Sequence, residues 1–205
     1  MTGEVTSIRL RRMMVVLSWL LLSGSSGANE SNNWTDDDFA LYPAYCRVKL
    51  TGESAQEVEY WKKYFGFDNY IHMHHYCFGL KAMTLAYANF GDRKRRSAFA
   101  LDVIRNMNYI LNATRKDFFM RPDALINLGR GYLLMSEGDK ARKAFEDALK
   151  LRPDSVDAWV ALSDLYHDAG QRKQALAVLE EALKRTGDHP KISLRMEELK
   201  KTGGR

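Results

Sequence analysis

Residues 125–153 read LINLGRGYLLMSEGDKARKAFEDALKLRP, and residues 159–187 read WVALSDLYHDAGQRKQALAVLEEALKRTG. Laid over each other at an offset of 34 residues, the two stretches carry similar side chains at matching positions. The matching pairs are Leu125 and Trp159, Leu128 and Leu162, Tyr132 and Tyr166, Ala141 and Ala175, Phe145 and Leu179, and Ala148 and Ala182. A fixed period of this length indicates a supersecondary unit that is repeated along the chain.

Each copy predicts two antiparallel helices. Leu128 and Tyr132 lie four residues apart, so they share one face of the first helix. We expect Ala141 at a close crossing of the two helices, because a larger side chain there would push them apart. The segments SEGD (136–139) and DAGQ (168–171) are the predicted turns, each with a glycine where the first helix stops.

The period and its pattern resemble the tetratricopeptide repeat, and Pro153 at the end of the first copy also fits that family. The resemblance implies an all-α solenoid of helix pairs, with one repeat at 122–155 and another at 156–189. Each repeat leaves an apolar face that a neighbour must cover. We therefore expect a degenerate repeat-like helix pair at 69–121, and a C-terminal capping helix and tail at 190–205.

The degenerate pair is predicted as helices over 71–90 and 95–113. Its Phe78-Gly79 step is similar to Leu128-Gly129 of the first clear repeat. The small–large–small spacing of the second helix is assigned to Ala100, Ile104 and Met107. Before this pair, residues 29–68 are predicted to form a polar segment and an irregular N-terminal cap, with a short helix that begins near Ser54.

Residues 1–28 are predicted to be a signal peptide. A basic start is followed by the apolar run MMVVLSWLLL (13–22), and Ser26 and Ala28 stand at −3 and −1 of a cleavage site before Asn29. The run is short for a bilayer span, which needs about 20 residues. The prediction is an exported protein, with the periplasm as its compartment. An uncleaved signal anchor is the alternative, and it would be the chain's membrane contact.

The charge of the chain argues against a nucleic-acid partner. The formal net charge is +5, and residues 1–28 contribute three arginines against one glutamate, which leaves +3 for the remainder. This is too little for a nucleic-acid footprint. The basic run RKRR (93–96) is interpreted as a solvated turn between the helices of the degenerate pair. An anion-binding loop is the alternative for this run.

Cys46 and Cys77 are the two cysteines of the chain. In an oxidising compartment such a pair tends to form a disulfide. Three histidines, His72, His74 and His75, lie just before Cys77, and together with it they offer four potential metal ligands. A single helix would point these ligands in two directions, which does not suit one tetrahedral ion.

Two interpretations of the histidine cluster therefore remain. In the structural one, Cys77 is bridged to Cys46, and one or two of the histidines pack against Tyr42, Tyr45 and Trp61. In the other, the protein is a metal-binding or redox-linked exported protein centred on His72, His74, His75 and Cys77. No nucleophile, base and orienting group come together in the sequence, so no catalytic residue is predicted, and no cofactor is implied.

The family resemblance implies a non-enzymatic scaffold whose concave groove binds a peptide or a helix of a partner protein. The predicted partner is another protein of the cell envelope, and polysaccharide or pilus assembly is one setting for it. Carried onto this sequence, the groove positions are Asn127, Arg130, Leu134, Val160, Asp164 and His167. Ile126 and Val160 stand where a carboxylate-clamp repeat would have polar residues, which argues against recognition of a free C-terminal carboxylate. Arg130 and Asp164 are expected to have no packing role.

Overall fold

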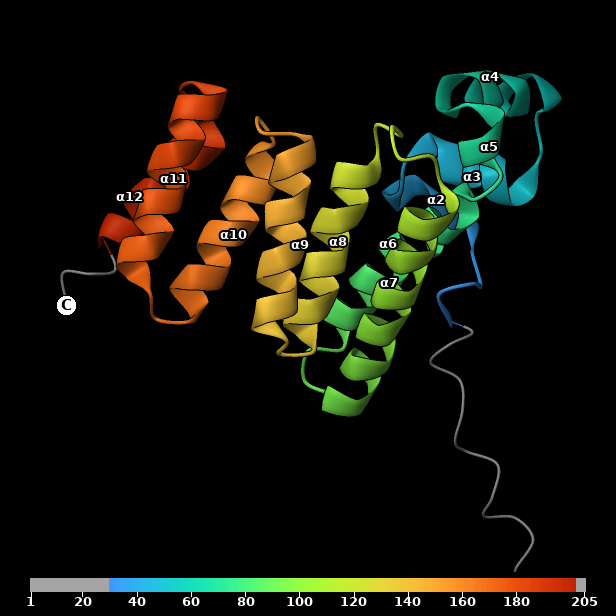
Figure 1. Cartoon of the computed structure of the whole chain (residues 1–205). Coiled ribbons are helices and arrows are strands. Elements are labelled where there is room, and N and C mark those ends of the chain that lie inside the picture. The colour runs from blue at the N-terminus through green and yellow to red at the C-terminus, as the bar shows by residue number, and fades with distance from the viewer. Residues whose placement is uncertain (1–29, 202–205) are drawn as a thin grey trace, which may run out of the picture.

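The computed structural model describes residues 30–201, and within this range the regular structure is helical (Figure 1). The predicted signal peptide lies outside the described residues. The helices of the N-terminal part are α2 (Asp36–Leu41), α3 (Ala44–Thr51), α4 (Ala55–Phe65) and α5 (Phe67–Tyr70). Among the described residues, none of the helices combines the length and the apolar character that a bilayer span requires.

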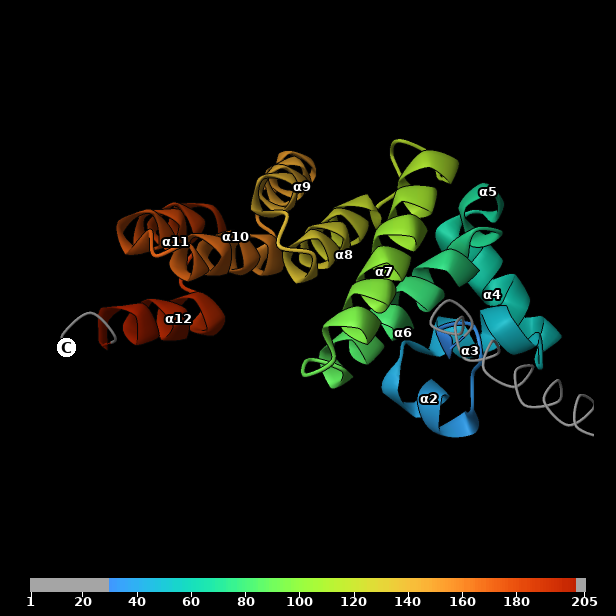
Figure 2. The same cartoon turned by 90° about the horizontal axis from the view of Figure 1, so that it is seen from below.

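Three helix pairs follow in chain order, as the ribbon in Figure 1 shows. They are α6 (Met73–Ala88) with α7 (Arg93–Ala113), α8 (Arg121–Leu134) with α9 (Gly138–Leu151), and α10 (Val156–Asp168) with α11 (Arg172–Thr186). Helix α12 (Pro190–Lys201) packs on the last pair. The predicted all-α solenoid of helix pairs is confirmed. Seen from below, α12 and α2 lie on the same side of the row that α6, α8 and α10 form (Figure 2).

Small residues set the close approach of the helices within each pair. Gly129 of α8 faces the buried ring of Phe145 on α9, and Ala141 is fully buried at the same crossing. In the next pair Ser163 takes the place of Gly129, and its hydroxyl donates to the carbonyl of Ala175 at 3.0 Å. Serine is small enough for this close crossing. Its buried hydroxyl is satisfied by the hydrogen bond to the backbone, so no unpaired polar group is left.

The degenerate pair follows the same plan in a different register from the predicted one. Gly79 of α6 faces the side chain of Met107, just as Gly129 faces Phe145. Met107 is therefore the counterpart of Phe145, and the predicted spacing through Ala100, Ile104 and Met107 is shifted by three residues. The buried row is Val103, Met107 and Ile110, whereas Ile104 is only partly buried. Gly131 of α8 makes a second close approach, to both Val103 and Ile104.

The turns within the two clear repeats match each other, although not at the glycine predicted for the first one. Gly138 already belongs to α9, and the residue with positive φ is Ser136, at 61°. Its counterpart 34 residues on is Gly170, at 73°. In both turns the next amide donates back to a tyrosine carbonyl, Glu137 to Tyr132 at 2.9 Å and Gln171 to Tyr166 at 2.8 Å.

The basic run 93–96 is the first turn of α7 and not a turn between helices. The side chain of Asp92 accepts from the amide of Arg95 and so caps the helix before the run begins. The interpretation failed because the N-cap lies one residue before the basic run. Arg95 pairs with Glu30 at 2.8 Å, and Arg96 donates to the carbonyl of Phe90 at 3.1 Å.

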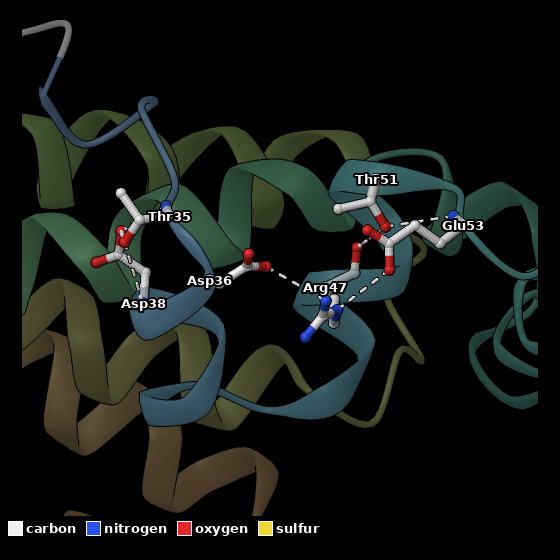
Figure 3. A network of polar contacts seen from close by, with 6 residues as sticks. All are labelled: Thr35, Asp36, Asp38, Arg47, Thr51 and Glu53. Carbon is white, nitrogen blue, oxygen red and sulfur yellow. Dashed lines mark hydrogen bonds and ion pairs between the residues drawn. The ribbon is translucent and has the colours of Figure 1, made fainter.

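The N-terminal cap is helical where an irregular one was predicted. The acidic run after Thr35 becomes α2, because Thr35 and Asp38 form a reciprocal capping box (Figure 3). Arg47 of α3 pairs with Asp36 at 3.3 Å and with Glu53 at 3.2 Å, and so it links α2 to the loop before α4 (Figure 3). The predicted helix near Ser54 is α4, and the Ser54 side chain caps it.

Candidate functional site

Cys46 of α3 and Cys77 of α6 form a disulfide with a Cα–Cα distance of 5.6 Å. Both cysteines are fully buried and lie in the core that the cap shares with the first helix pair. The bond fixes the cap to the solenoid. A bridged cysteine has no thiolate to offer, so the metal-binding alternative loses one of its four predicted ligands.

His72 and His75 pack against α7, and none of the three histidines forms a ring contact with Tyr42, Tyr45 or Trp61. The ring of His75 stacks on Tyr109 with a centroid distance of 3.7 Å, and its Nδ1 lies 2.7 Å from Oδ1 of Asn106. His72 Nδ1 lies 3.2 Å from the Tyr109 hydroxyl, and His74 Nδ1 lies 3.1 Å from the carbonyl of Ile71. The prediction was wrong because Cys77 turns toward the cap, while the rings of His72 and His75 meet Tyr109 of α7.

The surroundings of His72 and His74 favour the neutral form of these two imidazoles. Burial, followed by the neighbouring His75 and Lys49, lowers the pKa of His74 to about 4. Burial, again with His75, also lowers the pKa of His72. Neutral imidazole can bind a metal ion, but within residues 30–201 no three His, Cys, Asp or Glu side chains converge on one point. His72 and His75 contribute to the packing of α6 against α7.

The groove positions predicted on α8 are only partly available to a partner. Asn127 is buried, and its Nδ2 donates to the hydroxyl of Tyr76 on α6 at 3.2 Å. Arg130 is half-buried, and its Nη1 donates to Asn127 Oδ1 at 3.3 Å. Leu134 packs against the core at the end of α8. Arg130 is thus the polar side chain of this set that still reaches solvent, and it forms no ion pair with the described residues.

On α10 the predicted positions face the capping helix. Asp164 accepts from Nε of Arg195 on α12 at 2.6 Å. Val160 packs against the C-terminal core, and His167 is half-buried near the end of α10. The expectation that Asp164 has no packing role is wrong, because α12 returns over α10 and its arginine pairs with this carboxylate. The sequence pattern of α10 alone contains no information about that return.

A surface that sequence reasoning missed lies between the cap and the first clear repeat. We call it the aromatic surface and define it by Trp61 and Tyr64 of α4, Phe65 at the end of α4, Phe67 of α5, and Phe119 in the loop before α8. Phe65 is buried, but Tyr64, Phe67 and Phe119 are 54%, 61% and 46% exposed. Phe65 and Phe119 stack nearly parallel at 5.9 Å, and Tyr64 meets Phe119 edge to face at 5.5 Å.

Two hollows open on either side of the stacked pair of Phe65 and Phe119, which lines both of them. One, of about 330 Å³, is also lined by Pro43, Trp61, Tyr64 and Asp123. The other, of about 360 Å³, is also lined by Phe67, Asp68, Arg115 and Asp117. Aromatic walls with a few charged groups at the edge are typical of binding sites for ligands and peptides.

Hydrogen bonds hold the walls of these hollows in place. Arg152, at the end of α9, donates to the carbonyl of Phe119 at 2.6 Å and to both carboxylate oxygens of Asp123 at 3.0 and 3.1 Å. On the other side, buried Asn69 donates to the carbonyl of Phe65 at 2.8 Å and accepts from the amide of Arg115 at 3.0 Å. The aromatic surface is therefore pre-formed. The sequence signal for it was the aromatic-rich run that ends at Phe67, together with Phe118-Phe119.

Part of the chain is similar to a known protein family. Residues 122–195 match the family model described as tetratricopeptide repeat. None of the curated proteins matches the chain significantly. Among solved structures, the one described as "Crystal structure of MamA" aligns with 80% of this chain and 96% of its own, at a TM-score of 0.38 and 18% sequence identity. A likeness this weak supports no functional argument.

Proposed function

We propose that this chain, whose residues 122–195 belong to the tetratricopeptide repeat family, is an exported, non-enzymatic scaffold that binds another protein of the cell envelope. The repeats support an interaction scaffold in general terms. Export rests on the layout of residues 1–28, and the envelope partner follows from that compartment. The bound element is a peptide or a helix that lies along α8.

The observation that carries the proposal is that Arg130 reaches solvent without an ion-pair partner. Its guanidinium lies in the middle of α8, it reaches solvent, and it has no carboxylate partner within ion-pair distance in the described part of the chain. The equivalent position on α10, Asp164, is already paired with Arg195. Arg130 is therefore a positive group on this face that a partner can pair with. It favours an acidic side chain of the partner, since arginine binds carboxylates with paired hydrogen bonds.

The test is affinity capture of the protein from its native envelope, with identification of what stays bound. Arg130→Glu should abolish capture, because it places a carboxylate opposite the acidic partner. Lys173→Glu, on the exposed face of α11, makes the same change of charge away from α8 and should leave capture intact. Equal capture by both variants would show that the partner binds elsewhere. The identity of the captured protein would also decide whether polysaccharide or pilus assembly is the setting.

A further inference from the structure

We propose that the aromatic surface is a second binding site, which takes an extended, proline-containing peptide segment with an arginine beside the prolines. The site uses residues other than Arg130, so it stands independently of the function proposed above. Three observations carry the inference: the exposed rings, the paired hollows, and the excess of one carboxylate at one edge.

The rings supply the apolar part of the site. Tyr64, Phe67 and Phe119 each leave about half of their surface or more to solvent. Phe65 contacts the rings of Trp61, Tyr64 and Phe119 and so joins them in one cluster. Exposed aromatic patches of this kind mark interaction sites on soluble proteins. Proline-rich segments in the polyproline II conformation dock into aromatic-lined grooves, because they arrive already extended and lose little conformational entropy.

The paired hollows favour an extended chain over a helix. They share the stacked rings of Phe65 and Phe119 as a single wall. An extended segment can place two successive apolar groups on the two sides of this wall. A helix would need one continuous apolar groove. The hollow beside Trp61 is lined mainly by apolar side chains, Pro43 among them. Such a lining suits prolines of the partner, because proline has no N–H donor that would need an acceptor there.

The carboxylates that line the hollows select the residue of the partner that lies next to its prolines. The linings of the two hollows contain the carboxylates of Asp68, Asp117 and Asp123. Asp117 pairs with Arg115, and Asp123 pairs with Arg152. Asp68 is exposed and has no ion pair in the described part of the chain, although its charge acts on Arg115, the partner of Asp117. The hollow beside Asp68 is therefore lined by two carboxylates and one guanidinium, which leaves one negative charge in excess.

The exposed ring of Phe67 lies next to Asp68 in the sequence and lines the same hollow. A guanidinium can stack on an aromatic face while it donates to a carboxylate, and lysine cannot match both contacts. The geometry therefore selects arginine as the residue that accompanies the prolines.

The experiment measures fluorescence anisotropy of short labelled peptides with the full chain. The test peptide has a run of prolines followed by an arginine. One control peptide replaces the arginine by glutamate, and another replaces the prolines by alanines. The test peptide should bind at least about tenfold more tightly than either control. The glutamate control loses the charged contact, and the alanine control loses the apolar contacts.

Two variants of the protein locate the binding. Tyr64→Ala should weaken binding of the test peptide at least about tenfold, the loss expected for an aromatic anchor. Tyr87→Ala is the matched control, since Tyr87 is 53% exposed and lines neither of the two hollows. Asp68→Asn should remove the preference for arginine over glutamate and leave the preference for proline over alanine. Circular dichroism and a thermal melt would verify that each variant is folded.

Several outcomes would overturn the proposal. Equal affinity for the test peptide and both controls would show unspecific adhesion to exposed rings. Equal losses in Tyr64→Ala and Tyr87→Ala would place the binding elsewhere. Binding of a β-linked glucose oligosaccharide together with no binding of the peptide would assign the rings to sugar stacking. Loss of envelope capture in Arg130→Glu with unchanged peptide affinity would leave this site standing, because the two sites use different residues.

Discussion

The ring of Phe145 lies where a side chain at Gly129 would have to be. A Cβ atom at this glycine would come within 2.4 Å of Phe145 Cε1, and the ring itself is fully buried. The two residues form a close contact between the helices of the first clear repeat. Gly79 and Met107 repeat the relationship in the degenerate pair, where the corresponding distance is 2.2 Å.

We predict that Gly129→Ala destabilises the protein by about 2 kcal/mol, because the overlap with a buried ring outweighs the better helix propensity of alanine. Gly138→Ala is the control. No atom lies within 4 Å of a Cβ at that position, so the free energy of unfolding should stay the same or rise by up to about 1 kcal/mol. Denaturant melts of both variants check the prediction. Equal stability of the two would contradict the close approach.

Ser136→Gly should stabilise the protein by about 1 kcal/mol. Ser136 is a non-glycine residue with a φ of 61°, and an L-residue pays roughly 1–2 kcal/mol for this conformation. The greater entropy of unfolded glycine reduces the gain. The reverse change, Gly170→Ser at the equivalent turn, should lower the melting temperature. A melt in which both variants move the same way would sink the proposed equivalence of the two turns.

Reduction of the disulfide between Cys46 and Cys77 should lower the free energy of unfolding by about 3–4 kcal/mol. The bridge spans 31 residues, and that value is the loop-entropy estimate for a loop of this length. Chemical denaturation with and without a reducing agent measures the difference, and Cys46→Ala with Cys77→Ala should reproduce it. Thiol labelling of the denatured, unreduced protein should find no free cysteine. Two free thiols in protein from its native compartment would count against an oxidising location.

The ion pair between Asp164 and Arg195 should contribute about 0.5–1 kcal/mol to the docking of α12. Their side chains are 40% and 24% exposed, so the value of a partly solvated pair applies. A double-mutant cycle with Asp164→Ala and Arg195→Ala measures the coupling energy. Limited proteolysis should release the C-terminal helix faster in either single variant. Additive effects in the cycle would mean that the contact contributes nothing.

Acidification should destabilise the protein between about pH 6.5 and pH 4, in part through His74. The ordinary pKa of 6.5 applies to the unfolded chain, and burial lowers the pKa of His74 to about 4 in the folded protein. The unfolded chain therefore binds the proton first. The stability that neutral His74 contributes is fully present above pH 6.5 and is lost as the pH falls to about 4.

The measurement for His74 is the urea midpoint at pH 7 and at pH 5. His74→Gln should show a smaller drop between the two pH values than the unsubstituted protein. His167→Gln, on α10 and remote from the cluster, serves as the control and should keep the drop unchanged. A drop of the same size in His74→Gln would assign the pH dependence to other groups.

The candidate surfaces were less predictable from the sequence than the helices were. Arg130 could be placed on the face of α8 from the repeat pattern, because a helical position follows from its spacing to Leu128 and Tyr132. The ion pair of Asp164 could not be predicted in this way, because its partner Arg195 lies on another helix. The aromatic surface joins α4 to the loop before α8, and no local pattern connects Tyr64 with Phe119.

The sequence by itself determined the helix pairs, their period of 34 residues, and the small residues at the crossings, because helix geometry links spacing along the chain to a buried face. It did not determine what each face meets. The shifted register of Met107, the return of α12 onto Asp164, and the packing of His75 on Tyr109 were decided by tertiary structure. The physical reason is that periodicity reports whether a residue is buried, whereas its partner depends on how distant helices dock.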